Sequence, residues 1–320
     1  TVAKVTVVHR QPAMFRQDPG HNPEMTLEIH HHEVLTPPVH AASVILLRDS
    51  PEGLQVLLLK RHSKSNVLGG AYVFPGGKLD GLDSQVSPGD LDQSPAALQR
   101  ALAEDGLDEA TACGLHVAAL RETFEECAVL LHTPEWGDTD QARGRLRERL
   151  SAGLSFLPAM MDAGLRPLPT RLLQPWSRWV TPRRPSMMDR RFDTRFFVAI
   201  APADQQARHD EHEITEALWV RPNEAMHRYW AGELTLAPVQ VLSLMQVGRC
   251  RDAEQVMHTA RQKAPMQVMP EPHDIDGQRI LCYPGDPDHS VREPAWDGPT
   301  RMTFRNGRFE PEGGLRALLS

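Results

Sequence analysis

Three glutamates in one short segment are the residues with the clearest chemical potential. Glu122, Glu125 and Glu126 lie in the run LHVAALRETFEECAVLL, residues 115–131. In a helix, positions i, i+3 and i+4 share one face, so the three carboxylates are expected to lie together. Carboxylates gathered in this way repel one another unless a cation is bound, and hard oxygen ligands suit Mg²⁺ or Mn²⁺. The pattern predicts a divalent metal site, with a solvated acidic helix face as the alternative.

The rest of this helix indicates how the acids would be positioned. Arg121 precedes Glu125 by one helical turn, where its guanidinium group can hold that carboxylate. The opposite side of the helix carries a narrow apolar stripe made of Val117, Leu120, Phe124, Ala128 and Leu131. We therefore expect the helix to pack through this stripe and to present its acids on the other side.

The sequence FPGG at residues 74–77 changes the interpretation of the acidic helix. Together the two segments resemble the Nudix box, G-x5-E-x7-R-E-U-x-E-E-x-G-U, in which U is a bulky apolar residue or Thr. The second half of the box is matched by Arg121, Glu122, Thr123, Glu125, Glu126 and Val129. Nudix hydrolases cleave a nucleoside diphosphate linked to another moiety X, by attack of a metal-activated water on phosphorus.

The resemblance implies a role for each matched residue. Glu125 and Glu126 would be metal ligands, and Glu122 would be a ligand or the base that acts on water. Gly77 would offer its carbonyl oxygen to the same ion, Mg²⁺ or Mn²⁺. Arg121 would orient the carboxylates, so the predicted catalytic group consists of Arg121, Glu122 and Glu125.

Two departures from the box have consequences. Ala128 replaces the Gly that usually ends the helix, and a positive φ there would destabilise Ala by roughly 1 kcal/mol relative to Gly. Arg121 follows Gly77 by 44 positions, where the box allows 14, so about 30 residues are inserted. Counting back from Arg121 puts the first box Glu on Cys113, so this acid is expected to be absent or displaced. Its candidate replacements are Asp80, Asp83, Glu104, Asp108 and Glu109.

Further segments are similar to the larger coenzyme A diphosphatase branch of the family, which also carries a long insertion inside its box. The signature that precedes the box in these enzymes is matched in part by Leu57, Leu58, Arg61, Gly70 and FPGG, whereas Leu59, His62 and Asn66 depart from it. An LAPxQ segment stands at 236–240 and a PGD sequence at 284–286. This resemblance implies hydrolysis of coenzyme A or acyl-coenzyme A to 3′,5′-ADP and (acyl-)4′-phosphopantetheine.

Phosphate groups require cations, and arginine can bind them through two hydrogen bonds. The predicted substrate-binding residues are Arg61, Lys78, Arg191 and Arg195. Arg191 and Arg195 rank first because they share one face of a predicted strand, although a structural ion pair is the alternative for either. Arg183, Arg184 and Arg190 extend the supply of cations, and a further acid could come from Glu211, Glu213 or Glu216.

Apolar runs and turn residues predict an α/β fold, and the resemblance specifies a Nudix α/β/α sandwich with a mixed sheet. The expected strands are a hairpin at 40–62, a third strand at 71–77, a half-buried strand at 190–200 and a strand before Pro222. Helices are expected at 95–106, 142–153 and 155–164, with one more turn at 108–114 and a helix starting at Pro222. The pairs Asp276-Gly277 and Asn306-Gly307 predict two hairpins.

These elements suggest three regions. Residues 1–35 would form an N-terminal arm, residues 36–250 the Nudix domain and residues 251–320 a C-terminal extension with β-hairpins. The domain would contain the insertion 79–114 inside the box and a helical insertion at 133–170. The hairpins of the extension could cover the active site or form the contact of a homodimer.

Composition narrows the class of protein. The chain has 320 residues, of which 24% are charged, and a net charge of −7, which argues against a general nucleic-acid-binding protein. No apolar run approaches the 18 or so residues of a membrane span, and the four cysteines show no metal-binding spacing, so we expect a cytoplasmic enzyme with reduced thiols. Two alternatives stay open: hydrolysis of ADP-ribose or a dinucleotide, and a Nudix-fold binding or regulatory protein that has lost catalysis.

Overall fold

The computed structural model describes residues 32–320 except 64, 66–67, 188–189 and 209–213. Most of the predicted N-terminal arm therefore lies outside the described residues, as do Asn66, Glu211 and Glu213.

A mixed sheet forms the centre of the molecule. Its strands follow the order β3-β2-β1-β6-β5-β8, with β4 also paired to β1 and β7 to β2. The strands are β1 (Val39–Ser50), β2 (Gly53–Arg61), β3 (Tyr72–Val73), β4 (Gly76–Lys78), β5 (Gln174–Val180), β6 (Phe192–Ile200), β7 (Ile214–Val220) and β8 (Met266–Val268). The predicted hairpin of β1 and β2 is confirmed, and β1 runs parallel to β6 on its other side.

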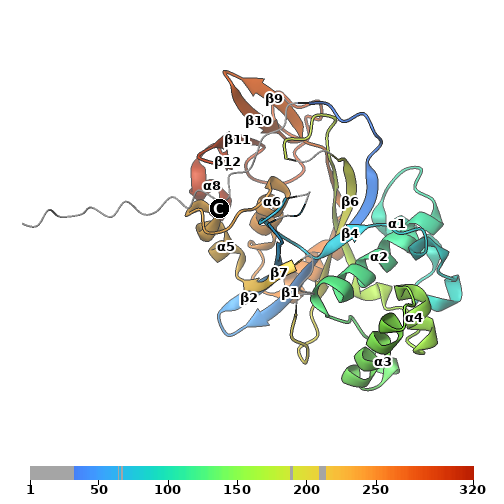
Figure 1. Cartoon of the computed structure of the whole chain (residues 1–320). Helices are drawn as coiled ribbons and strands as arrows, with labels where there is room; N and C mark the ends of the chain where they lie inside the picture. The colour runs from blue at the N-terminus through green and yellow to red at the C-terminus, as the bar shows by residue number, and fades with distance from the viewer. Residues whose placement is uncertain (1–31, 64, 66–67, 188–189, 209–213) are drawn as a thin grey trace, which may run out of the picture.

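Helices cover both faces of this sheet, as Figure 1 shows, which confirms the predicted α/β/α sandwich. One face carries α1 (Pro95–Leu102), α2 (Glu109–Cys127), α3 (Thr139–Ser151) and α4 (Phe156–Asp162). The other carries α5 (Pro222–Trp230), α6 (Pro238–Val247) and α7 (Ala253–Gln262). Among the described residues, no helix combines the length and the apolar character needed to cross a membrane.

The central strands are apolar on both sides because each face packs against a separate core. In β1, Val44 and Leu46 point into the core under α2, whereas Ile45 and Leu47 point into the core under α6 and α7. Strand β6 lies between β1 and β5 and is covered in the same way, so even Asp193 and Arg195 are buried. The expectation that the 190–200 strand would be half-buried is therefore wrong.

A second sheet is built from the C-terminal residues. It consists of β9 (Glu271–Ile275), β10 (Gln278–Cys282), β11 (Arg301–Arg305) and β12 (Arg308–Pro311), and α8 (Gly314–Leu319) follows it. Both predicted hairpins are confirmed, and their Asp-Gly and Asn-Gly turns have the positive φ values that such two-residue turns require. Met302 and Phe309 of this sheet are fully buried in the core beneath α6. The proposed domain boundary near residue 250 stays a prediction.

Two elements around the box differ from the expectation. The segment 71–77 forms two short strands instead of one, because β3 pairs with β2 and β4 pairs with β1. Residues 108–114 belong to the start of the acidic helix, which begins at Glu109 with Asp108 as its N-cap. This helix is buried around most of its circumference and not only along one stripe, since α1 and α4 pack against it as well as the sheet.

Candidate active site

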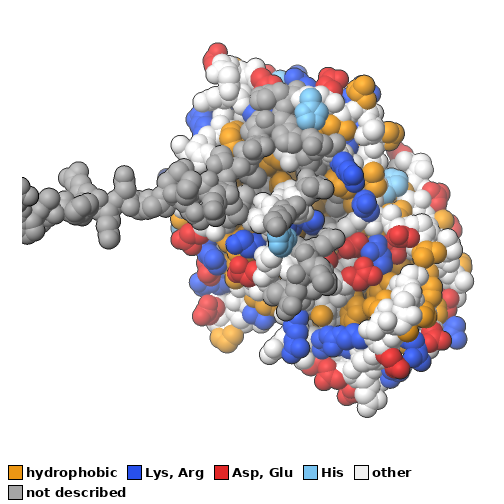
Figure 2. Space-filling view, in the orientation of Figure 1, with side chains coloured by type: hydrophobic (Ala, Val, Ile, Leu, Met, Phe, Trp, Pro, Cys, Tyr) orange, Lys and Arg blue, Asp and Glu red, His pale blue; other side chains and the backbone are white. Residues whose placement is uncertain are grey.

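Helix α2 and strand β4 meet at the two glycines of FPGG. A Cβ atom at Gly77 would lie 2.2 Å from Oε1 of Glu122, so the backbone can approach this glutamate so closely only because residue 77 is glycine. The N–H of Gly76 donates a hydrogen bond of 2.8 Å to Oε2 of Glu126. The two halves of the predicted motif are thus in direct contact despite the long insertion. Figure 2 shows acidic and basic side chains gathered over the region where β4 and α2 meet.

Arg121 links two of the three glutamates. Its Nη1 donates to Oε1 of Glu122 at 2.7 Å and to Oε2 of Glu125 at 3.1 Å, so the predicted contact with Glu125 is present. Its Nη2 donates to the backbone oxygen of Lys78 in β4 at 2.9 Å. Burial disfavours the charged guanidinium, but its hydrogen bonds to Asp83 and the charges of the neighbouring carboxylates outweigh this effect and raise the Arg121 pKa.

Asp83 is the acid that completes this network. Arg121 donates through Nε and Nη2 to its two carboxylate oxygens, at 3.0 and 2.9 Å, in the bidentate geometry of strong ion pairs. The Asp83 side chain is only 2% exposed. Asp83 stands six residues after Gly77, which is the box spacing G-x5-E when the count runs forward. Asp83, one of the five candidate replacements, therefore stands where the box has its first Glu when the count starts at Gly77, and it contacts Arg121.

Close packing of the insertion on α2 brings Asp83 to Arg121. Asp83 lies in a short 3₁₀ turn, Asp83–Gln85, and a Cβ atom at Gly114 of α2 would lie 2.3 Å from Oγ of Ser84 in that turn. Cys113, the position reached by counting back from Arg121, is buried in the apolar core beneath α2. The other candidate acids have different places: Asp108 caps α2, Glu104 binds Arg195, and Asp80 and Glu109 are exposed.

Helix α2 ends at the position that the box predicts, but Ala128 takes the place of the glycine expected there. Ala128 has φ 57° and ψ 21°, the left-handed conformation that glycine adopts most easily, and its N–H donates to the oxygen of Phe124. The substitution of the box Gly therefore keeps the helix end in place with some backbone strain.

The electrostatics of the glutamates favour a bound cation. Burial raises the pKa of both Glu122 and Glu125, and the positive charge of Arg121 opposes that rise. A divalent cation would stabilise the charged carboxylates in the same direction as Arg121. Glu122, Glu125 and Glu126 supply carboxylate oxygens beside a glycine backbone, which are the hard donors that suit Mg²⁺ or Mn²⁺, but here the three do not bring one oxygen each within 4.8 Å of one another.

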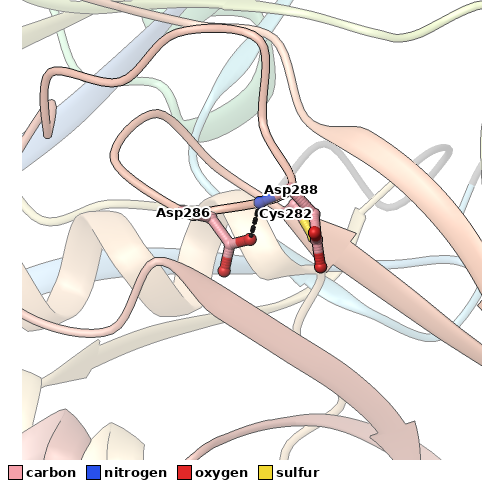
Figure 3. Close-up of side chains that lie close together, drawn as sticks. All are labelled: Cys282, Asp286 and Asp288. Carbon is pink, nitrogen blue, oxygen red and sulfur yellow. Dashed lines mark hydrogen bonds between the residues drawn. The ribbon is translucent and has the colours of Figure 1, made fainter.

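A second acidic group lies far along the chain. The ligand atoms of Cys282, Asp286 and Asp288 all lie within 4.8 Å of one another, and among the described residues no other group of His, Cys, Asp or Glu does so. Figure 3 shows these side chains, with the Asp288 N–H bonded to Asp286. Arg301 already donates to both carboxylates of this group. The hydrogen bonds from Arg301 lower the Asp286 pKa to about 2. We therefore interpret this group as an ion-paired turn of the C-terminal extension.

The three glutamates face a cavity of about 980 Å³. Gly76, Gly77 and Lys78 of the FPGG turn line it together with Glu122, Glu125 and Glu126. Basic side chains at its wall are Arg61, His62, Lys78 and Arg190. Apolar and aromatic side chains form much of the remaining wall: Phe74, Trp179, Phe192, Phe196, Leu281 and Tyr283.

The four predicted substrate-binding residues separate into two pairs. Arg61 and Lys78 line the cavity, whereas Arg191 and Arg195 do not. Arg195 is 2% exposed and bonded to Glu104 and to Asp193, so it joins the insertion to the sheet. Arg191 donates to the backbone oxygen of Thr181. The alternative of a structural ion pair therefore describes Arg195 better than phosphate binding does.

Sequence reasoning did not identify the far wall of the cavity. Leu281 and Tyr283 come from the C-terminal extension and Trp179 from β5, and no local pattern relates them to the box. The first turn of α6, residues 237–240, also lines the cavity, and here the LAPxQ motif was a usable signal. Glu216, the described member of the three further acids, accepts a hydrogen bond from the Tyr72 hydroxyl and does not line the cavity.

Comparisons with known proteins agree with this geometry. A family model described as the NUDT19 Nudix domain matches residues 34–247. The acyl-coenzyme A diphosphatase NUDT19 of Xenopus laevis is 29% identical over 226 residues, which cover 60% of this chain and 59% of that protein. The human protein of the same description is 27% identical over 232 residues, 59% of each chain. The chain thus spans about three fifths of the length of these relatives.

A solved structure resembles the fold. The crystal structure of a Nudix hydrolase from Alicyclobacillus acidocaldarius superposes with a TM-score of 0.54 at 28% sequence identity. The match covers 70% of this chain and 97% of that one. Nearly all of the smaller protein therefore corresponds to part of this chain.

Proposed function

The chain belongs to the Nudix family described by the NUDT19 Nudix domain, and from this premise we propose that it is a divalent-metal-dependent pyrophosphatase. Its substrate in this proposal is coenzyme A or an acyl-coenzyme A. Water adds to one phosphorus of the pyrophosphate, and the bond from that phosphorus to the bridging oxygen breaks. The products are 3′,5′-ADP and (acyl-)4′-phosphopantetheine, with the protons of water released to solvent.

One observation carries the proposal: a single cavity holds the glutamates of the box, basic side chains and a broad apolar wall. Coenzyme A has the same division, since its nucleotide end and pyrophosphate carry the negative charge and its pantetheine arm carries none. Two of the similar relatives are described as acyl-coenzyme A diphosphatases, which supports this substrate class.

The chain's own residues supply positioning and proton transfer. Asp83 fixes Arg121, and Arg121 in turn holds the Glu122 and Glu125 carboxylates at the cavity. Glu125 is the more exposed of the two, with 40% of its side chain accessible against 13% for Glu122. We assign to Glu122 or Glu125 the acceptance of a proton from the attacking water, because burial raises the pKa of both towards the range of a useful base.

Mg²⁺ or Mn²⁺ would be held by Glu122, Glu125, Glu126 and the Gly77 carbonyl oxygen. When bound, such an ion lowers the pKa of water and neutralises charge on the pyrophosphate oxygens. Arg61 and Lys78, which line the cavity, would bind the phosphate groups. Arg191 and Arg195 are left out of this assignment because neither lines the cavity.

Two rival functions differ in their observable consequences. A pyrophosphatase for ADP-ribose or a dinucleotide would use the same glutamates, but its substrate has no pantetheine arm to lie against the apolar wall. A protein that has lost catalysis would have no need of the ordered Asp83, Arg121 and glutamate network. The network therefore favours an active hydrolase.

The test is a substrate panel. The full chain is incubated with an acyl-coenzyme A, ADP-ribose or NADH, each with Mg²⁺ or Mn²⁺, and the products are identified by mass spectrometry. The proposal expects the acyl-coenzyme A to be cleaved most efficiently into the two named products. Preferred cleavage of ADP-ribose or NADH would overturn the substrate assignment, and no turnover with either metal would support the binding-protein alternative.

A further inference from the structure

Gln240 carries a buried polar group that the fold does not use. Its side chain lies on the first turn of α6, is 5% exposed and lines the cavity that holds the glutamates. The carboxamide oxygen Oε1 is buried and accepts no hydrogen bond from the part of the chain that the structure describes. A buried acceptor without a partner is unfavourable by an amount comparable to a lost hydrogen bond. Other buried polar atoms of this kind occur in the fold, but among the described residues only that of Gln240 belongs to a residue lining the cavity.

The backbone places Gln240 close to the catalytic turn in the fold. The N–H of Tyr72 donates to the oxygen of Thr235 at 2.9 Å, and Leu236 forms a parallel bridge with Tyr72, two residues before FPGG. The segment 235–240 then enters α6, which packs against α5 and α8 (Figure 1). The glutamine is therefore held by a rigid helix next to the FPGG turn and not by a loose loop.

The chemistry of a carboxamide limits what it would bind. It offers one acceptor and two N–H donors and has no charge, so its best complement is a group that also donates and accepts, such as a secondary amide. The cavity that Gln240 lines also has apolar side chains in its wall, among them Pro238, Val239, Leu281 and Tyr283. The phosphates instead require the cations of the same cavity, Arg61 and Lys78 among them.

We infer that Gln240 is a specificity-determining residue that hydrogen-bonds an amide of the pantetheine arm of the substrate, with the apolar wall covering that arm. This inference rests on the proposed function, because pantetheine contains two secondary amides in an otherwise uncharged chain. ADP-ribose contains the same adenosine diphosphate and no such amide. Gln240 therefore selects for the non-nucleotide half.

Calorimetric binding of the two product halves tests the inference. The full-length wild type and the variant Gln240→Met, which keeps side-chain length but removes the carboxamide, are titrated with 4′-phosphopantetheine and with 3′,5′-ADP in the presence of Mg²⁺. Gln240→Met is expected to weaken binding of 4′-phosphopantetheine by about tenfold, the effect of one lost hydrogen bond in a desolvated site, and to leave 3′,5′-ADP unchanged.

Ser243 provides a matched control. It lies three residues further along α6, is buried, and its hydroxyl also lacks a partner, but it does not line the cavity. Ser243→Ala should leave both affinities at the wild-type value. A loss that Ser243→Ala shares with Gln240→Met would show that the helix packing and not the carboxamide is responsible, and would overturn the inference.

A second test changes the ligand and not the protein, so its result does not depend on whether a variant folds. Wild-type protein is titrated with two analogues of 4′-phosphopantetheine, each with one amide replaced by an ester. One analogue should bind about tenfold more weakly, and equal binding of both analogues and the parent would overturn the inference. So would a Gln240→Met effect on 3′,5′-ADP alone, which would place the adenine at this residue. If the wild type cleaves ADP-ribose but no acyl-coenzyme A, the proposed function itself fails.

Discussion

Arg121 is the residue that determines the geometry of the site. It contacts Asp83, Glu122, Glu125 and the backbone oxygen of Lys78, and so joins the insertion, the acidic helix and β4. Because the Asp83 carboxylate fixes two of the guanidinium nitrogens, the remaining nitrogen is directed to the glutamates. Asp83 therefore acts through Arg121 as a positioning residue.

Replacement of Asp83 by Asn should lower turnover more than substrate binding. The variant keeps the shape of the side chain but removes its charge, so Arg121 loses its bidentate partner. We expect kcat for an acyl-coenzyme A to fall roughly 10- to 100-fold, as for other residues that orient catalytic groups, with a smaller change in KM. Asp80→Asn, an exposed acid of the same loop, is the control in steady-state kinetics. Equal losses for the two variants would contradict the role of Asp83.

Ala128 offers a test of the helix end. With φ at 57°, Ala128→Gly should relieve backbone strain and raise the free energy of unfolding by about 0.5 to 1 kcal/mol, with unchanged turnover. Urea unfolding monitored by circular dichroism measures this difference. A loss of stability in the glycine variant would show that the left-handed conformation is not strained.

At the residue level, the resemblance to the box predicted a contact across the long insertion. Gly77 and the glutamates were predicted to meet, and the structure places them in contact. The sequence left Asp83 as one of five candidates, because the position of the first box acid was counted back from Arg121 through the insertion. The length of the insertion shifts that count but does not prevent Asp83 and Arg121 from meeting in the folded chain.

At the scale of elements, a buried ion-pair network joins α1 to the sheet. Glu104, just after α1, contacts Arg195 of β6 and Arg178 of β5, and Asp193 bonds to both arginines. Arg195 and Glu104 are each 2% exposed. The sequence could not reveal this network, because the partners come from strands and helices far apart in the chain.

Glu104→Gln should therefore destabilise the fold without altering the cavity. Loss of this charge leaves Arg195 buried with only Asp193 as a charged partner, and we expect the free energy of unfolding to fall by about 3 kcal/mol. Asp162→Asn, which breaks the exposed pair with Arg149, is the matched control and should change stability by less than about 1 kcal/mol. If Glu104→Gln unfolded like the wild type but raised KM, Arg195 would be a substrate ligand after all.

At the scale of the whole molecule, the C-terminal extension is part of the active-site cavity. Its Leu281 and Tyr283 line the cavity, while Met302 and Phe309 are buried in the core. The hairpins of this extension were predictable from Asp-Gly and Asn-Gly, and the sandwich from the resemblance to the Nudix family. The contribution of the extension to the cavity wall could not be predicted from the sequence, because it depends on how the two sheets pack.

The Asp286–Arg301 pair should make the extension sensitive to acid. The Asp286 pKa is lowered from 3.8 to about 2 in the folded state, mainly by hydrogen bonds from Arg301. A depressed carboxyl pKa adds stability that is complete above the unfolded pKa and is lost as the pH falls through the folded value. Asp286→Asn should thus lower the free energy of unfolding by about 2 kcal/mol at neutral pH.

The pH dependence of this loss distinguishes the ion pair from simple packing. The difference between wild type and Asp286→Asn should shrink to roughly half near pH 3, because the wild-type advantage disappears as Asp286 is protonated. Urea unfolding at both pH values gives the comparison. A difference that stays constant with pH would indicate that the charge of Asp286 contributes nothing.

The central claim is that hydrolysis occurs at the glutamates of α2 and not at the acidic group of the C-terminal extension. The most direct measurement compares kcat for acyl-coenzyme A hydrolysis, with saturating Mg²⁺, in the wild type, Glu125→Gln and Asp288→Asn. We predict a fall of at least about 100-fold for Glu125→Gln and wild-type turnover for Asp288→Asn. Full turnover in Glu125→Gln, or loss in Asp288→Asn alone, would contradict the claim.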